Sequence, residues 1–142
     1  MDRNDRLART IGMIGEKSVE FLQTKRVAVF GLGGVGSACA ESLCRGGIGN
    51  IDIIDFDSVS VSNLNRQLLS DIHSIGYKKT ETMLKRIRSI APDVNVYMHD
   101  LMFLPETEND GISARNCIFA KYYRNTKCAL RSNWLKKSEK IF

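Results

Sequence analysis

Short apolar runs alternate with amphipathic stretches along the first hundred residues of the chain. Three five-residue runs are rich in valine, isoleucine and aromatic residues, as buried parallel strands usually are. We expect strands at residues 26–30 ("RVAVF"), 50–54 ("NIDII") and 94–98 ("VNVYM").

Helical patterns lie between these strands. Residues 34–45 are mostly small and are followed by Gly46-Gly47, where a glycine suits the end of a helix. Residues 78–91 have the period of an amphipathic helix, and Pro92 stops it. The apolar face of that helix consists of Met83, Leu84, Ile87, Ile90 and Ala91.

Two further segments complete the predicted fold. Residues 13–24 suit a short amphipathic helix before the first strand, and residues 57–77 lack a clear period and indicate a long crossing loop. Strand, helix, strand, helix, strand is the order of the first half of a doubly wound sheet. We therefore predict an α/β, Rossmann-like parallel sheet, its N-terminal half only (β-α-β-α-β), preceded by an N-terminal helical segment.

The α/β rhythm is lost after about residue 104. Residues 1–110 carry a net charge of −2, whereas residues 111–142 carry +7, which together give the +5 of the whole chain. We predict the N-terminal part of a nucleotide-binding domain at residues 1–104 and an irregular basic tail at residues 105–142. Our hypothesis is that the tail is a non-native ending, as a frame shift would produce. The alternative is a native tail that binds RNA.

Composition narrows the class of protein. The 142 residues are 43% hydrophobic and 26% charged, as in ordinary soluble globular proteins. No apolar run reaches the roughly 18 residues of a membrane-spanning helix, and the N-terminus lacks the apolar core of a signal peptide. The four cysteines form no CxxC pair, so we expect neither a zinc knuckle nor a thioredoxin-type motif. A reduced, cytoplasmic setting with structural cysteines fits best, and we assign no metal-ligating residue.

A glycine-rich turn follows the first strand, in the sequence "GLGGVG". Gly31 permits a tight turn, Gly33 lets a phosphate approach the backbone, and Gly36 lets the helix pack closely on the strand. The N-terminus of the following helix offers free N–H groups to an anion. Asp55 follows at the spacing of a carboxylate that binds ribose hydroxyls. The turn therefore predicts a nucleotide site but does not distinguish NAD from ATP.

A polar run after the second strand, "DFDSVSVSNLNRQ", shifts this balance. Asp57 either orients a neighbouring arginine or an ordered water, or is a solvated loop acid. Arg66 suits a bidentate contact with phosphate oxygens, and Lys79 at the start of the next helix adds a compact second charge. A triphosphate requires these cations more than a dinucleotide does, so the pair favours ATP. Each one alone would be read as an ordinary surface cation.

The segments "GLGGVGS", "DFDSVSVSNLNRQ" and "IGYKK", in this order and spacing, resemble the ThiF/MoeB/HesA family, which is related to the ubiquitin-activating enzymes. Finer details resemble one branch, the tRNA threonylcarbamoyladenosine dehydratases. These details are "GEKSVEFL", "VGSACAESLCRGGIG" and "MLKRIRSIAPDV", and the match extends over about residues 6–100.

The resemblance implies ATP-dependent adenylation of a carboxylate, that of threonylcarbamoyladenosine in tRNA, followed by cyclisation. It implies ATP and Mg²⁺ as cofactors. It also implies tRNA as substrate, a homodimer, and a sulfur-carrier or desulfurase-type partner protein. An N-terminal arginine of the family reaches the ATP of the partner subunit; Arg9 is the better match here and Arg6 the alternative. The remaining implied contacts are Gly34 in the nucleotide loop, Asp55 at the ribose, and Asn63, Asn65, Arg66, Gln67 and Lys79 at the phosphates.

The sequence departs from the family after residue 110. The family's next strand ends in an aspartate that holds magnesium, and no segment of that kind follows here. Cys117 and Cys128 match nothing in the family. Because the magnesium aspartate is missing, we expect this chain alone to have weak or no adenylating activity. Two other functions stay open: a fragment of an NAD(P)-dependent oxidoreductase, and a non-catalytic nucleotide-binding or partner-binding remnant.

Overall fold

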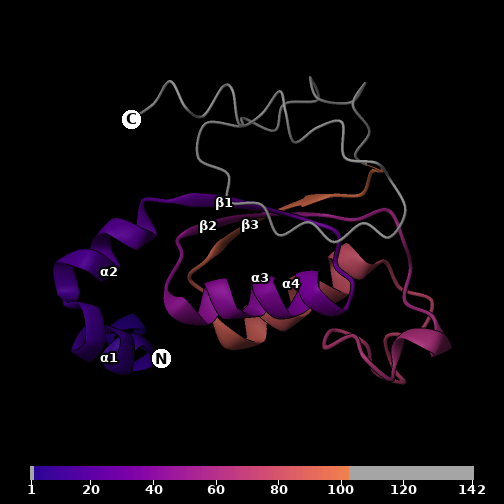
Figure 1. Cartoon of the computed structure of the whole chain (residues 1–142), viewed down its shortest axis with the longest axis horizontal. Coiled ribbons are helices and arrows are strands. Elements are labelled where there is room, and N and C mark those ends of the chain that lie inside the picture. Colours follow the sequence, from indigo (N-terminus) through magenta and orange to yellow (C-terminus); the bar gives the residue numbers. More distant parts are fainter. Residues whose placement is uncertain (1, 103–142) are drawn as a thin grey trace.

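The computed structural model describes residues 2–102, which contain three strands, four α-helices and one 3₁₀ turn (Figure 1). The strands match the predicted runs, the third shifted by one residue. In chain order the elements are α1 (Arg3–Ile14), α2 (Glu16–Gln23), β1 (Arg26–Phe30), α3 (Gly34–Gly46), β2 (Asn50–Ile54), η1 (Val61–Asn63), α4 (Lys79–Ile90) and β3 (Asn95–His99).

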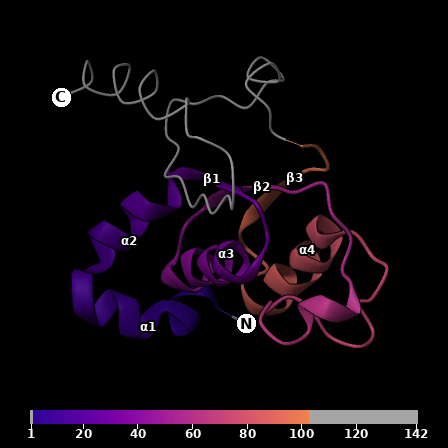
Figure 2. The same ribbon diagram turned by 45° about the vertical axis from the view of Figure 1, so that its right-hand side comes forward.

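The sheet is parallel, with the strand order β1-β2-β3. The register pairs Val27 with Ile51 and Ile51 with Val96. Helices α3 and α4 lie side by side against one face of the sheet, while α1 and α2 lie at the end where β1 begins (Figures 1 and 2). This is the predicted Rossmann-like arrangement, so the α/β fold class is confirmed.

The main core lies between the sheet and the two helices α3 and α4. Successive side chains of a strand point to opposite faces of the sheet, so every second residue faces this core. Its fully buried members include Val27, Val29, Leu32, Cys44, Ile51, Ile53, Met83 and Ile87. Burial also raises the pKa of the Cys44 thiol to about 12, so this cysteine is an inert part of the packing.

The opposite face of the sheet carries a charged cluster centred on β2. Asp52 is 2% exposed and accepts two hydrogen bonds from Arg26, at 2.7 and 2.8 Å. His99 Nε2 lies 2.8 Å from the same carboxylate. Burial raises the pKa of Asp52, but the bonds from Arg26 and His99 outweigh that effect and leave the pKa lowered. The carboxylate therefore ties the three strands together on this face.

The N-terminal segment differs from its prediction. We expected one helix over residues 13–24, but α1 ends at Ile14 and α2 begins at Glu16. Gly15 between them has φ +84, which interrupts the helix, and its N–H bonds back to Ile11 O at 2.8 Å. Helix α1 itself was not predicted, because its mean hydropathy is low and Leu7 is its sole buried residue.

Several expectations lie outside the described residues. They are the division at residue 104, the basic tail at residues 105–142, the missing magnesium aspartate beyond residue 110, and the cysteines at positions 117 and 128. Within residues 2–102, no helix has the length and apolar character needed to cross a bilayer.

Candidate functional site

The glycine turn joins β1 to α3 at the carboxyl end of the sheet. Gly31 has φ +83, and its N–H donates to Ile54 O at 2.8 Å. A Cβ on Gly36 would lie 1.7 Å from Gly31 O, so only glycine allows the helix to approach the turn this closely. The space beside Gly33 is open, and no side chain caps α3. The first N–H groups of α3 are thus available to an anion.

Asp55 links the ends of β1 and β2. It is 7% exposed, and one of its oxygens accepts from Leu32 N in the glycine turn. The other oxygen accepts from Asp57 N at 2.8 Å. A carboxylate oxygen has a second acceptor position, so Asp55 can still accept from a ribose hydroxyl while it holds the turn in place.

Lys79 stands at the start of α4 and points to the same region. The residue is 5% exposed, and its Nζ lies 2.8 Å from Asp57 Oδ2. The Asp57 side chain is half-exposed. Its backbone carbonyl also accepts a hydrogen bond from Lys79 N at 3.1 Å. Asp57 is therefore neither a free loop acid nor the partner of an arginine; it is the residue that positions Lys79.

Two asparagines of the predicted phosphate motif form hydrogen bonds within their own loop. Asn63 caps η1, because its Oδ1 accepts from Ser60 N at 3.0 Å. Asn65 Oδ1 accepts from Arg66 Nη1 at 2.9 Å, and Ser62 O accepts from the same nitrogen at 2.8 Å. Asn63 and Asn65 thus shape the loop and orient the guanidinium.

These residues surround a cavity of about 530 Å³ at the carboxyl ends of β1 and β2. Such a volume suits a nucleotide-sized ligand. Parallel α/β sheets bind ligands at this edge. The cavity is lined by Phe30, Gly31, Gly33, Gly34, Val35, Ile54, Asp55, Phe56, Asp57, Arg66, Gln67, Lys79 and Leu101. Most of the predicted contacts therefore converge on one place.

Apolar residues of the cavity were missed by the sequence reasoning. Phe56 is 42% exposed between the two aspartates, and Leu101 follows β3. A large exposed aromatic residue between two carboxylates was the available signal. Together with Val35 these side chains offer an apolar surface of the kind that suits a base.

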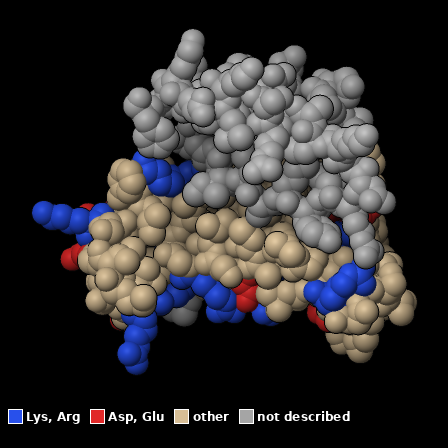
Figure 3. Space-filling view, viewed as in Figure 1, with Lys and Arg blue, Asp and Glu red and all other residues tan. Residues whose placement is uncertain are grey.

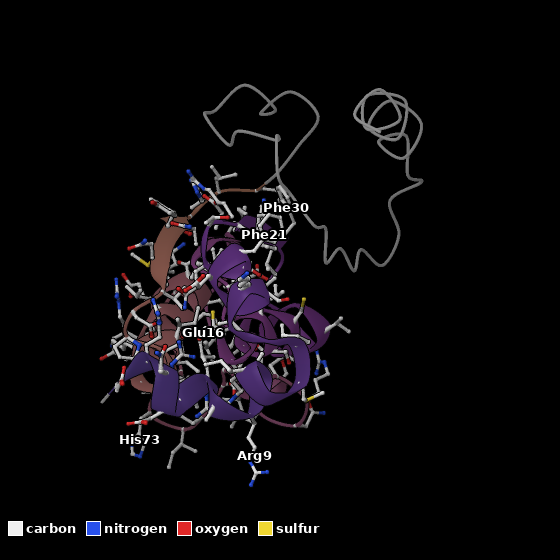
Figure 4. All side chains as sticks on the ribbon, turned by 90° about the vertical axis from the view of Figure 1, so that its left-hand side faces the viewer. Arg9, Glu16, Phe21, Phe30 and His73 are labelled. Carbon is white, nitrogen blue, oxygen red and sulfur yellow. The ribbon has the colours of Figure 1, made fainter. Side chains whose placement is uncertain are left out.

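Arg9 does not line the cavity. It is exposed on α1, and Figure 4 places it and the cavity residue Phe30 on opposite sides of the molecule. Arg6 is also remote from the cavity, because it bonds to Asp93 at 2.8 and 2.9 Å and to Cys44 O at 3.1 Å. Arg6 fastens α1 to the amino end of the sheet.

Charges elsewhere on the described surface are mixed. Lys and Arg side chains lie along the helix side of the molecule together with acidic residues (Figure 3). One such group joins α3 to α4, where Glu41 pairs with Arg45 and Arg86. Within residues 2–102, no group of three or more His, Cys, Asp and Glu side chains is arranged to hold a metal ion.

Comparison with known proteins shows the family. A model of the ThiF family matches residues 5–120. The tRNA threonylcarbamoyladenosine dehydratase of Escherichia coli is 41% identical over 71% of this chain and 38% of its own length. The dehydratase of Bacillus subtilis is 40% identical over 66% of this chain and 37% of its own. The aligned part of the chain thus spans less than half the length of these relatives.

Solved structures show the same likeness. The crystal structure of the E. coli dehydratase in complex with ATP superposes with a TM-score of 0.86 and 34% identity. The superposition covers 95% of this chain and 56% of that one. In sequence, the chain is also similar to the molybdopterin-synthase adenylyltransferase of E. coli, which is 39% identical over 54% of this chain and 31% of its own length.

Proposed function

Because the chain belongs to the ThiF family, we propose that its cavity binds ATP for the activation of a carboxylate, that of threonylcarbamoyladenosine in tRNA. The names of two relatives at about 40% identity support this substrate. The ATP-bound structure of the E. coli dehydratase supports the nucleotide. We further propose that the reaction takes place in the cytoplasm.

One observation carries the proposal: Arg66 and Lys79 line the same cavity as the glycine turn. Arg66 is held by Ser62 O and Asn65, and Lys79 is held by Asp57. The first N–H groups of α3 face the same space. A pyrophosphate on a helix N-terminus needs no further cations, whereas a triphosphate carries charge beyond the reach of those N–H groups.

The residues present fit ATP. Gly33 leaves open space where a phosphate would approach, and Asp55 keeps acceptor positions for ribose hydroxyls. Mg²⁺ would neutralise phosphate charge in the proposed site. Asp57 is the half-exposed carboxylate of the cavity and would contribute one ligand to the ion. The other ligands would come from water and the phosphates.

The proposed chemistry needs positioning and charge stabilisation. An oxygen of the substrate carboxylate attacks the α-phosphorus, an acyl–phosphate bond forms, and the bond to the β-phosphate breaks as pyrophosphate leaves. No proton moves in this step. Arg66 and Lys79 stabilise the charge that develops on the phosphate oxygens. In the following step the activated carboxyl cyclises, and AMP and one proton leave.

We also propose that two copies of the chain form a composite site. Arg9 is exposed and lies on the far side of the molecule from its own cavity. An arginine in that place can complete only the cavity of another subunit. A sulfur-carrier or desulfurase-type protein is proposed as a further partner.

The test is isotope exchange between pyrophosphate and ATP, measured with tRNA that carries threonylcarbamoyladenosine. We expect weak exchange that depends on this tRNA and that Arg66→Ala abolishes. Exchange at the rate of a full-length relative would contradict the expectation of weak activity. Arg88→Ala is the matched control, because Arg88 bonds to Pro92 O outside the cavity. Binding of NADH in place of ATP would favour an oxidoreductase. Binding of ATP without exchange would favour a non-catalytic nucleotide-binding role.

A further inference from the structure

Gln67 contains a buried acceptor that the folded chain leaves unused. The residue lines the cavity and is 7% exposed. Its Oε1 has no hydrogen-bond partner among residues 2–102. Buried side-chain polar atoms are nearly always paired, and an unpaired one costs about 1–3 kcal/mol. An exception in a ligand cavity calls for a donor that belongs to the ligand.

The backbone holds this side chain in the wall. Gln67 N donates to Asn63 O at 2.9 Å, and Gln67 O accepts from Ser70 N at 2.9 Å. Arg66 O lies 3.2 Å from the position that a Cβ on Gly34 would take, so the loop rests directly on the start of α3. The backbone of Gln67 is therefore fixed in the cavity wall.

The missing donor narrows the ligand chemistry. Ionised phosphate oxygens only accept hydrogen bonds, so they do not satisfy Oε1. Arg66 Nη1 donates to Ser62 O and Asn65, and no bond joins Arg66 to Gln67 Oε1. The donors of a nucleotide are its ribose hydroxyls and the amino group of its base. The ribose is the nearer candidate, because Asp55 in the same cavity is the residue placed to bind it.

We propose that Gln67 Oε1 accepts a hydrogen bond from a ribose hydroxyl of the bound nucleotide, and that Gln67 thereby sets a preference for ribonucleotides over deoxyribonucleotides. This inference rests on the proposed binding of ATP in the cavity. It assigns Gln67 to the sugar, whereas Arg66 beside it serves the phosphates. The consequence is a specificity that depends on one amide.

The experiment measures the affinities of the full 142-residue chain for ATP, 2′-deoxy-ATP and 3′-deoxy-ATP by calorimetry. The variant is Gln67→Met, which keeps the length of the side chain and removes the acceptor. We expect the wild type to prefer ATP over one of the deoxy forms, and the variant to reduce that preference about three- to tenfold. The matched control is Gln23→Met, because Gln23 accepts from Arg3 outside the cavity and should leave the preference unchanged.

A second measurement separates ligand recognition from folding. Loss of an unpaired buried acceptor should leave the thermal midpoint of the ligand-free protein unchanged or higher. Gln67→Glu keeps an acceptor at the same place, so it should retain the preference for ribose. Its negative charge should lower the affinity for all three nucleotides. This variant tests the proposal even if Gln67→Met fails to fold.

Two results would overturn the assignment and leave ATP binding intact. One is an equal loss of affinity for all three nucleotides in Gln67→Met, which would mean that the amide faces the phosphates. The other is a wild type that does not distinguish ATP from either deoxy form. Absence of ATP binding by the wild type would instead overturn the proposed function itself.

Discussion

Individual side chains in the cavity differ in how cleanly they can be tested. Asp55 accepts from Leu32 N and Asp57 N, so its replacement would disturb the turn as well as any ribose contact. Lys79 is a better choice. Its Nζ has one charged partner, Asp57, which remains half-exposed to water when the lysine is removed.

We predict that Lys79→Ala weakens ATP binding about ten- to a hundredfold, because a charge-assisted hydrogen bond to phosphate contributes about 1.5–3 kcal/mol. Lys79→Arg should restore part of the affinity. Lys78→Ala is the control, because Lys78 bonds to Phe56 O and pairs with Asp100 without lining the cavity. Equal losses for the two alanine variants, measured by calorimetry, would contradict a specific role for Lys79.

At this scale the sequence predicted residue types better than contacts. The spacing of "GLGGVG", Asp55, Arg66 and Lys79 was sufficient to bring them to one cavity. It did not indicate that Asp57 holds Lys79, or that Asn63 caps a 3₁₀ turn. Those bonds depend on how the loop at residues 57–77 folds back, and a loop without a hydrophobic period gives no signal of its path.

Close contact between elements is most demanding where α3 meets β1. We predict that Gly36→Ala destabilises the protein by more than about 3 kcal/mol, because the new Cβ would collide with the carbonyl of Gly31. Gly12→Ala is the matched control. Gly12 is exposed within α1 with open space around it, so alanine should stabilise by up to about 1 kcal/mol. Chemical denaturation of both variants measures the difference.

Helices α3 and α4 are joined by Glu41, which gives this contact a pH dependence. Hydrogen bonds from Arg86 and Arg45 hold the pKa of Glu41 below its ordinary value, although burial opposes them. A depressed carboxyl pKa contributes stability above the unfolded-state pKa, and this stability is lost as the pH falls through the folded value. We predict a flatter acid limb for Glu41→Gln than for the wild type in thermal unfolding between pH 3 and 7. Parallel curves would contradict this linkage.

The sequence predicted the order of the strands and helices better than the residues at which they begin and end. Apolar runs of five residues located β1 and β2 to the residue. The limits of the two N-terminal helices were not predicted. Gly15 interrupts a pattern that is typical of one helix, and α1 buries a single leucine. Where few side chains enter the core, hydrophobic periodicity carries little information.

For the molecule as a whole, the position of Arg9 leads to a test of assembly. We predict that Arg9→Ala and Arg66→Ala each bind ATP weakly alone, and that their mixture recovers about a quarter of the sites, since half of randomly exchanged dimers would contain one intact site. Arg3→Ala on the same helix should bind ATP without being mixed with a second variant. A mixture that recovers nothing would contradict a site shared between subunits.

The charge of the cavity has a consequence for how the whole protein responds to salt and metal. The ionisable side chains that line it, within the described residues, are Asp55, Asp57, Arg66 and Lys79, two anions and two cations. A triphosphate would enter a space without surplus positive charge. Its affinity should therefore depend little on ionic strength and strongly on a cation that arrives with it, whether Mg²⁺ or a guanidinium from a second subunit. A balanced cavity of this kind would bind free ATP more weakly than ATP that arrives with its counter-charge.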